Sequence, residues 1–461
     1  MTQHDPLGEI SPLTGEPRAS LPWLAFLILF FASVFYVNEA NWLVSTYESY
    51  ALSVDDAGTQ VADGNRWRQL SYLTVGALGA LLTIVPSRQP IHFRSLPFAL
   101  LCMYVLVCLA SVAWSDAAWL TTKRLATSIF GLLAIIGVAR QLSIRDLINL
   151  AIGIATILLT VGVYAEVCLG TFAPWVGEYR FAGIVHPNAQ GGICSVMTIA
   201  AFFGMKAANR GKSVYLCLFL LAAGFLLLTK SRTSIAACLC GASAAWFLMA
   251  SGSKRTLVGL ALPTAVCAGI AAMLLLGAEL SNSGSNATSL GREDDQDLTS
   301  LNGRVPLWGN VVGHIAHRPL LGYGYQAFWT SDRIYEVSLE EEWTVPNAHS
   351  VFLEVLLSTG LVGGTVLGLG VLIIGCQIAA RCRQTATATD GFVVALSVYA
   401  VIAAIFESGF AQPNGFEPFI VGVGLLHVIS SRRQAESTPD LASCRTELPS
   451  NWKAASAGGL A

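Results

Sequence analysis

The amino-acid sequence predicts an all-α polytopic membrane protein, and three observations support this fold class. Of the 461 residues, 54% are hydrophobic and only 12% are charged, whereas soluble domains carry about 25% charged residues. Long apolar runs recur along the chain, and basic residues follow every second run. A run of roughly 20 apolar residues fits a helix that crosses roughly 30 Å of hydrocarbon, where backbone hydrogen bonds have to be made within the protein.

The apolar runs give about twelve expected membrane spans, of which the last is short. They cover residues 21–38, 70–86, 96–114, 125–139, 146–169, 190–207, 213–229, 233–251, 256–280, 361–380, 390–407 and 417–430. Polar tails flank the spans, and a long polar connection separates the ninth span from the tenth. The expected organisation is a tail over 1–20, the first nine spans within 21–280, a loop over 281–350, the remaining spans within 351–430 and a disordered tail over 431–461.

The connections after the even-numbered spans each hold two or more basic residues. These residues are Arg88, Arg94, Arg140, Arg145, Lys206, Arg210, Lys212, Lys254, Arg255, Arg381, Arg383, Arg432 and Arg433. Cytoplasmic connections carry such an excess of Lys and Arg, so both tails are expected to be cytoplasmic. The long connections, above all 281–350, then face outward, and functional residues concentrate in such loops.

Charge and cysteine usage argue against two kinds of partner. The formal net charge is −2, and proteins that bind phosphate backbones carry a clustered basic face, so no nucleic-acid partner is expected. The cysteines lie mostly inside apolar runs and form no CxxC pair. They are interpreted as small core residues, and no metal site is expected from them.

The stretch RFAGIVHPNAQGG, residues 180–192, interrupts the apolar pattern on the expected outer side. Pro187 is expected to stop one helix, while Gly191 and Gly192 loosen the start of the next. Such a break leaves backbone N–H groups that could form an anion site together with the Arg180 guanidinium. The alternative is a basic residue at the membrane interface beside an Asn turn.

Two further arginines lie on the same expected side. Arg232, in LTKSRTS, lies between two closely spaced spans, where a charge is expected to face a cavity or a partner, although snorkelling at the interface is the alternative. Arg304 opens an expected amphipathic helix over 304–317, at the end where the helix dipole favours an anion. The apolar residues of this helix that recur at helical spacing are Val305, Trp308, Val311, Val312 and Ile315.

The segment after this helix is rich in aromatic residues. Pro319 is expected to end the helix, and GYGYQAFW, residues 322–329, is expected to form a flexible aromatic strip suited to a sugar or to the headgroup zone. The alternative is an interfacial helix with a Tyr and Trp belt and no substrate.

His349 lies between the long loop and the next span and is a candidate general base, because a neutral imidazole accepts a proton near neutral pH. A lone loop histidine is more often structural, and that alternative stays open. Glu354, inside the following apolar run, is a candidate partner for a cation. The acidic stretch REDDQD at 292–297 lacks the spacing of a calcium loop and is expected to be solvated.

The order of these motifs resembles that of the O-antigen ligase and polymerase superfamily of bacterial envelope glycosyltransferases. The matching stretches are RFAGIVHPNAQGG at 180–192, LTKSRTS at 228–234, GR...W...PLLGYGYQAFW at 303–329 and NAHSVFLEVLLSTGLVGG at 347–364. WSDAAWLTTKR at 114–124 makes the chain more similar to the exopolysaccharide-polymerase branch than to the ligase branch. The ordered set is more specific than any single motif.

The resemblance implies a GT-C-like fold in the bacterial inner membrane, with 281–350 as a periplasmic loop and the active face on the periplasmic side. It also implies an inverting, metal-independent transfer of a saccharide from undecaprenyl pyrophosphate, without a cofactor. Arg180 and Arg304 match arginines that engage the pyrophosphate. Arg232 matches a further arginine of the family, and we expect it to bind the pyrophosphate as well. His349 matches a histidine that serves the acceptor hydroxyl.

His186, Asn188, Asn347 and Glu354 are expected to support this site. Many relatives have His-Asn where this chain has NAHS, so the residue after His349 departs from the family pattern. The implied partners are an oligosaccharide on undecaprenyl pyrophosphate, a saccharide or lipid A-core acceptor, a chain-length regulator and a flippase.

Three functions follow from these observations. The first is polymerisation of exopolysaccharide repeat units, and the second is ligation of finished polymer to lipid A core. The third is a transporter or flippase, which would be expected to show internal repeats and ionisable groups near mid-membrane. The unusual charges of this chain cluster instead at the outer ends of spans and in one long loop, which favours the enzymes.

Overall fold

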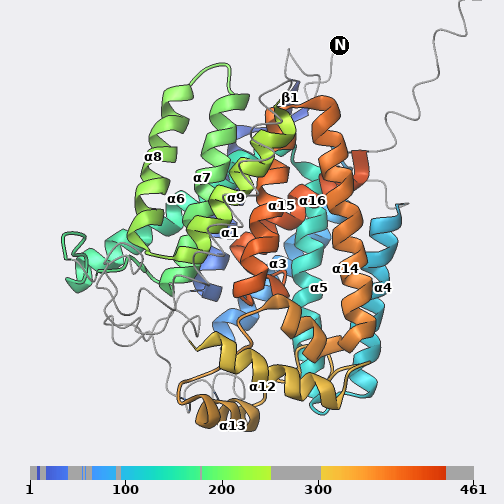
Figure 1. The fold of residues 1–461 in the computed structure, drawn as a ribbon. Helices are drawn as coiled ribbons and strands as arrows, with labels where there is room; N and C mark the ends of the chain where they lie inside the picture. The colour runs from blue at the N-terminus through green and yellow to red at the C-terminus, as the bar shows by residue number, and fades with distance from the viewer. Residues whose placement is uncertain are drawn as a thin grey trace, which may run out of the picture.

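The structure is a computed structural model that describes residues 8–10, 17–39, 54, 58, 65–89, 95–176, 179–250 and 303–431. Within these residues the chain is a bundle of α-helices, preceded by the two short antiparallel strands β1 (Gly8–Ile10) and β2 (Pro17–Ala19) (Figure 1). A helical polytopic membrane protein is therefore confirmed. The expected ninth span and the acidic stretch 292–297 lie outside the described residues.

Each of the other expected spans falls on a helix. These helices are α1 (Leu21–Glu39), α3 (Arg66–Ile84), α4 (Leu96–Ala110), α5 (Ala118–Gln141), α6 (Ile144–Leu169), α7 (Pro187–Ala207), α8 (Lys212–Leu228), α9 (Arg232–Met249), α14 (Val351–Thr385), α15 (Ala388–Phe406) and α16 (Phe416–Ser431). In the described part of the chain, seven helices are long and apolar enough to cross a membrane. The number of twelve spans thus stays a prediction.

Local sequence signals fix several helix boundaries. Ser143 and Asp146 form a reciprocal capping box at the start of α6, and Gly170, in the left-handed conformation, ends the helix. Asn65 caps α3 by accepting hydrogen bonds from two backbone amides of its first turn. These caps satisfy backbone groups that a helix end leaves without partners.

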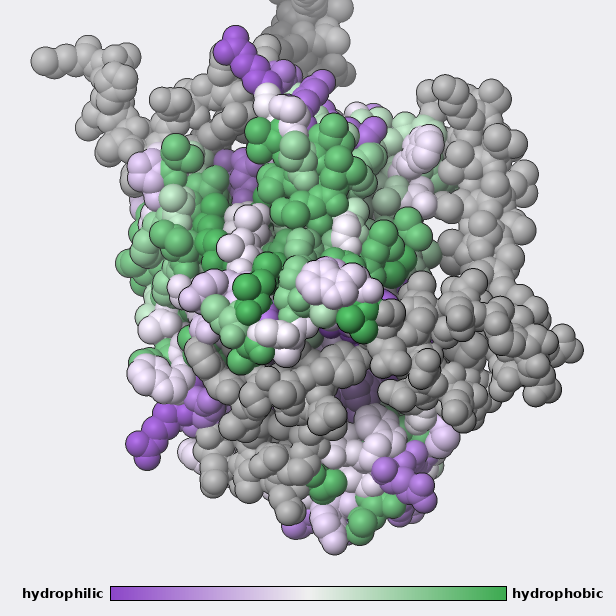
Figure 2. Space-filling model, turned by 90° about the vertical axis from the view of Figure 1, so that its left-hand side faces the viewer, coloured by the Kyte–Doolittle hydropathy of each residue, from purple (hydrophilic) through white to green (hydrophobic). Residues whose placement is uncertain are grey.

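Helix α7 lies in the interior of the bundle. Every residue from 190 to 201 is buried, and α6, α8, α9 and α15 pack around the helix. Helices such as α8 and α14 instead expose leucines, for example Leu220 and Leu372. Figure 2 shows hydrophobic side chains gathered over the helical part, between hydrophilic residues at its two ends. The motif at 180–192 therefore leads directly into the buried helix.

Helices α12 (Arg304–His317) and α13 (Ser331–Glu341) lie across one end of the bundle, and we call residues 303–350 the loop module (Figure 1). The expected amphipathic helix is thus present with its expected bounds. Its buried face is centred on Leu307 and Val311, whereas Val305 and Val312 are exposed. The remaining buried core of the module consists of Tyr323, Phe328, Trp329, Ile334, Val337, Val345 and Ala348, with Leu357 from α14.

The expectation of a flexible aromatic strip at 322–329 is wrong, because all eight of these residues are buried. The Tyr325 hydroxyl is hydrogen-bonded to Ser128 Oγ at 2.9 Å, and Trp329 Nε1 donates to a Glu354 carboxylate oxygen at 2.9 Å. Polar tips that find partners inside the protein allow aromatic rings to be buried. The strip therefore anchors the loop module and offers no open platform.

The expected tenth span, residues 361–380, lies within α14, which begins at Val351. The helix is broken at Gly360 (φ 60°, ψ −160°), and the segment 319–324 packs against the break. Amides after the break donate to this segment, and carbonyls before the break accept from it. The four bonds are Leu361 N to Pro319 O at 2.8 Å, Val362 N to Leu320 O at 3.1 Å, Tyr323 N to Leu357 O at 2.7 Å and Gly324 N to Ser358 O at 3.0 Å.

A second attachment joins the loop module to the connection between α4 and α5, where η2 (Ser111–Ala113) lies. Asp116 accepts from Arg318 at 2.8 Å and from Arg333 at 3.3 Å. Trp114 Nε1 donates to the Leu321 carbonyl at 3.1 Å. The WSDAAW motif therefore holds the module in place.

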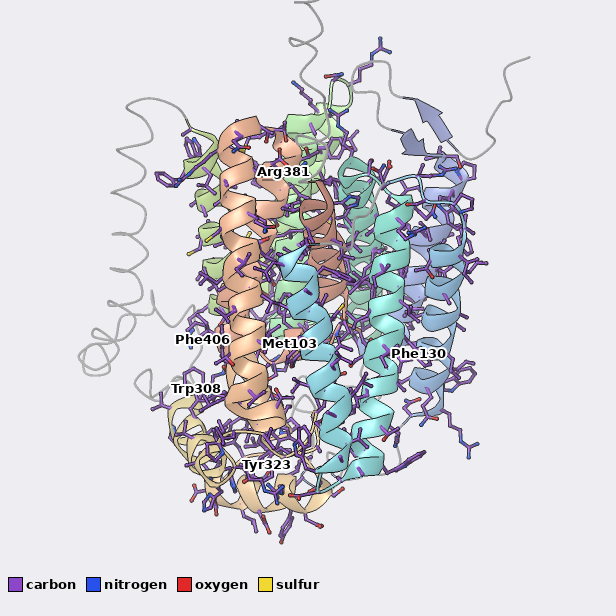
Figure 3. All side chains as sticks on the ribbon, turned by 90° about the vertical axis from the view of Figure 1, so that its right-hand side faces the viewer. Met103, Phe130, Trp308, Tyr323, Arg381 and Phe406 are labelled. Atoms are coloured by element: carbon purple, nitrogen blue, oxygen red, sulfur yellow. The ribbon has the colours of Figure 1, made fainter. Side chains whose placement is uncertain are left out.

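Residues that the predicted topology assigns to opposite faces of the membrane lie at opposite ends of the bundle. The N-terminal strands lie at the end opposite to α12 and α13 (Figure 1). Arg381, from an expected cytoplasmic connection, lies far from Tyr323 and Trp308 of the loop module (Figure 3). This arrangement is what the topology requires, while the faces themselves stay a prediction.

We expect Gly360→Ala to destabilise the protein. A Cβ atom there would lie 2.4 Å from the Leu320 carbonyl carbon, and a strained positive φ costs about 1–3 kcal/mol by itself. Gly368→Ala in the same helix is the matched control, since a Cβ there meets nothing within 4 Å. Thermal unfolding of both purified variants in detergent tests this, and equal melting temperatures would contradict it.

Candidate functional site

Arg304 is the first residue of α12 and points to the end of α15. Gly303 precedes it in the left-handed conformation (φ 77°), where a Cβ would approach the Trp343 indole nitrogen to 3.3 Å. One Arg304 guanidinium nitrogen lies 2.9 Å from Glu407 Oε1, with exposed side-chain fractions of 14% and 28%. A partly buried Arg–carboxylate pair of this kind is charge-assisted and directional.

Glu407 also connects Arg304 with the motif at 180–192. Asn188 Nδ2 donates to the same Glu407 Oε1 at 3.0 Å, and Asn188 Oδ1 accepts from the Arg180 guanidinium at 3.2 Å. Arg180, Asn188, Glu407 and Arg304 therefore form one hydrogen-bonded row, which we call the arginine row. The structure thus brings together Arg180, Asn188 and Arg304, which are far apart in the sequence.

Sequence reasoning missed Glu407. The residue follows α15 directly, and the sequence placed it at the end of an apolar run. A carboxylate at the outer end of an expected span was the available signal, because the expected arginines lie on that side. Only the fold shows that its partners are Arg304 and Asn188.

Arg180 is buried, with 7% of the residue exposed. Its Nε donates to the Thr229 carbonyl at 3.2 Å, just after α8 ends. Arg232 begins α9 three residues later, where Ser231 caps the helix. The structure therefore places Arg232 on the segment that holds Arg180, and its role stays a prediction.

Two backbone amides of the 180–192 motif, those of Ala182 and Gly183, are not free to bind an anion, which corrects the expectation for this turn. Ala182 N and Gly183 N donate to Glu166 Oε1 of α6 at 2.9 and 2.7 Å, and the Tyr179 hydroxyl donates to the other oxygen of Glu166. An internal carboxylate thus already binds these donors, and buried donors without partners are costly. The motif presents its arginine and asparagine instead.

Gly191 and Gly192 do not loosen the start of a helix, because both lie buried inside α7. A Cβ at Gly191 would lie 2.8 Å from Ser231 Cβ, and one at Gly192 would lie 1.8 Å from Glu417 Oε1. These glycines therefore allow α9 and α16 to approach α7 closely. The sequence alone predicts flexibility from these two glycines, because the residues that they contact, Ser231 and Glu417, are distant along the chain.

His186 is the N-cap of α7, and its Nδ1 accepts from Asn188 N at 3.2 Å. An imidazole nitrogen that accepts carries no proton, so this bond favours the form of His186 with hydrogen on Nε2. His186 thereby holds the helix turn from which Asn188 reaches Glu407.

His349 lies in a tight turn just before α14, with a left-handed backbone (φ 48°). Its amide donates to Asn347 Oδ1 at 3.0 Å, and its ring lies 5.6 Å from the Trp343 ring, measured between centroids. Among the described residues, His349 Nε2 is buried without a hydrogen-bond partner. Asn347 thus shapes the turn that presents a nitrogen able to bind a ligand.

The imidazole of His349 is neutral in this site. Burial, the positive charge of Arg304 and a contribution from His186 together lower its pKa to about 3, and burial is the largest cause. A ligand that offsets the positive charge of Arg304 would raise the pKa of the ring.

Glu354 holds the His349 loop, and its pairing with a cation stays a prediction. One carboxylate oxygen accepts from Ala348 N at 2.6 Å and from Trp329 Nε1 at 2.9 Å. Trp308 adds a third tie, because its Nε1 donates to the Ala348 carbonyl at 3.0 Å. The aromatic strip, α12 and the His349 loop are thus fixed to one another.

The His349 loop also contacts the end of α15, beside the arginine row. Ser350 N donates to Ser408 Oγ at 3.1 Å, and Ser408 follows Glu407. The Trp308 and Phe406 rings lie 6.2 Å apart between centroids, and Figure 3 shows both at the same end of the bundle. Two guanidinium groups, one carboxylate and a neutral imidazole therefore share this region.

The arrangement can bind an anion and accept a proton. Two arginines linked by hydrogen bonds suit a phosphate-containing group, since guanidinium matches phosphate geometry. Within the described residues, no three His, Cys, Asp or Glu side chains gather as metal ligands would. Metal independence stays a prediction.

Comparison with known proteins supports the resemblance. Residues 217–368 match the O-antigen ligase family model, which spans the segment from α8 to α14. The exopolysaccharide production protein ExoQ of Rhizobium meliloti (strain 1021) is 24% identical over 383 residues, which cover 80% of this chain and 84% of that protein. The chain is therefore similar to the O-antigen ligase family and to an exopolysaccharide production protein, in line with the resemblance that the ordered motifs carry.

We expect the His349 ring to stay neutral between pH 8 and pH 5 in the empty protein. Histidine ring signals in NMR spectra test this, with His349 assigned through the signal lost in His349→Gln. In Arg304→Gln the pKa of His349 should rise, because a neighbouring positive charge that opposes protonation is removed. Titration of the wild-type ring near pH 6.5 would contradict the buried, positively charged environment.

Proposed function

We propose that this chain is a membrane glycosyltransferase that moves a saccharide from undecaprenyl pyrophosphate to a sugar acceptor, polymerising exopolysaccharide repeat units at the periplasmic face of the bacterial inner membrane. The observation that carries this proposal is the hydrogen-bonded row that links Arg180 through Asn188 and Glu407 to Arg304, beside the His349 loop. The donor diphosphate binds the two guanidinium groups, and the acceptor hydroxyl lies at His349.

Transfer requires the C1–O bond between the sugar and the diphosphate to break. The departing diphosphate gains negative charge, and fixed guanidinium groups in a poorly hydrated site stabilise this charge as the bond breaks. Arg180 is held by Thr229 and Asn188, and Arg304 by its place on α12. Both therefore act as oriented cations, so the proposed reaction is metal-independent.

The acceptor hydroxyl attacks C1 from the face opposite to the diphosphate, which inverts the configuration at C1. Its proton passes to His349 Nε2, a buried nitrogen without a protein partner. In the empty site Arg304 opposes protonation of this ring. A bound diphosphate neutralises the arginines, and the pKa of His349 then rises toward the range useful for a base.

Polymerisation is favoured over ligation by the breadth of the similarity to the exopolysaccharide production protein, which extends over most of both chains. The matched family model carries the name O-antigen ligase, so transfer of polymer to lipid A core is the second candidate. Both reactions share the donor and the leaving group and differ in the acceptor. A flippase would leave the arginine row beside a buried imidazole without a chemical use.

A deletion strain distinguishes the two reactions. We expect secreted polysaccharide to disappear while the lipopolysaccharide ladder on a gel stays unchanged, and the plasmid-borne gene should restore the polymer. If lipid A core instead loses its ladder and undecaprenyl-linked polymer accumulates, the protein is a ligase.

Arg304→Ala is expected to lower product formation by about 100-fold or more, because loss of one group that stabilises the leaving charge typically has this effect. Arg304→Lys should retain part of the activity, since it keeps the charge and loses the planar fork. Polymer yield in the deletion strain measures both. Arg210→Ala, in the exposed connection between α7 and α8, is the control that should keep activity, and wild-type yield from Arg304→Ala would remove Arg304 from the site.

A further inference from the structure

We propose that Glu407 is an internal anion that occupies the diphosphate subsite of the empty protein and gives up Arg304 and Asn188 to the incoming donor. This inference rests on the proposed function, and it makes the Glu407 carboxylate a competitor of the donor diphosphate in the same site. The carboxylate thereby weakens donor binding in exchange for an easier release of undecaprenyl pyrophosphate after transfer.

The first support is the convergence of two donors on one oxygen. Arg304 and Asn188 donate to the same Glu407 Oε1, at 2.9 and 3.0 Å. Asn188 in turn accepts from Arg180, so this oxygen lies at the midpoint of the arginine row. A phosphate oxygen that accepts from both Arg304 and Asn188 has to take this position or one next to it.

The second support is the backbone of Glu407. The residue caps α15 in an extended conformation (φ −139°, ψ 142°), and its amide still donates to the Ala403 carbonyl. Its side chain can therefore turn away without unwinding the helix. The exposed side-chain fraction of 28% leaves room for this movement, whereas Arg304, at 14%, is more confined.

The third support is electrostatic. Arginines in a poorly hydrated region are costly without a counter-charge, because removing one partner of a buried pair leaves an uncompensated ion. Glu407 supplies that charge while the site is empty. A diphosphate that arrived beside an unmoved Glu407 would meet a like charge, which costs several kcal/mol in a close contact. The two anions therefore exclude each other.

Glu407→Gln separates this role from simple support of the arginines. Glutamine keeps an oxygen that can accept from both Arg304 and Asn188, and it loses only the negative charge. If Glu407 competes with the donor, the variant binds a diphosphate more tightly. If Glu407 merely holds Arg304 in place, the variant binds it equally or more weakly.

The experiment is calorimetric titration of inorganic pyrophosphate into the purified full-length chain in detergent. We expect Glu407→Gln to bind about tenfold or more tightly than the wild type, and the gain should vanish when Arg304→Ala is added. Asp390→Asn is the matched control, because Asp390 pairs with Arg381 at 2.6 Å at the other end of the bundle. This control should bind like the wild type.

Two failures can be told apart. If neither the wild type nor Glu407→Gln binds pyrophosphate, the proposed diphosphate site is wrong. If the wild type binds and Glu407→Gln binds no more tightly, the site stands and the competition is overturned. Should Glu407→Gln fail to fold, Glu407→Asp takes its place, since its shorter side chain weakens both contacts and should also tighten binding; equal or weaker binding overturns the proposal.

Discussion

The position of the candidate site depends on how the backbone polar groups at the Gly360 break are satisfied. Groups at membrane depth need partners within the protein, and the segment 319–324 supplies them through four hydrogen bonds to α14. This pairing fixes the loop module on the bundle. Since α12 belongs to the module and α7 to the bundle, the same pairing lets Arg304 and Asn188 bind the same oxygen of Glu407.

Internal carboxylates organise the rest of the region. Glu166 binds the backbone donors of the turn that carries Arg180, and Glu354 binds the amide of Ala348 and the Trp329 indole beside His349. Glu407 differs from these two because its partners are the side chains of Arg304 and Asn188. Asn188 in turn accepts a hydrogen bond from Arg180. Two carboxylates thus build the site, and the third lies within it.

Hydrophobic periodicity predicted the helical membrane fold and the bounds of α12, since both depend on local sequence. The arginines and His349 were found from their unusual placement and from motif order. Glu166 and Glu407 were missed because their partners are distant along the chain, and no local pattern reveals a long-range hydrogen bond. For the same reason Gly191 and Gly192 were interpreted as flexible, although they accommodate Ser231 and Glu417, and the aromatic strip was interpreted as open.

The orientation of the Asn188 carboxamide limits which side chains position 188 tolerates. Its oxygen faces Arg180 and its nitrogen faces Glu407, so the side chain must accept at one end and donate at the other. Aspartate would turn the donating end into a second acceptor facing a carboxylate, and leucine would offer neither. Among side chains of this length, the amide alone joins a cation on one side to an anion on the other.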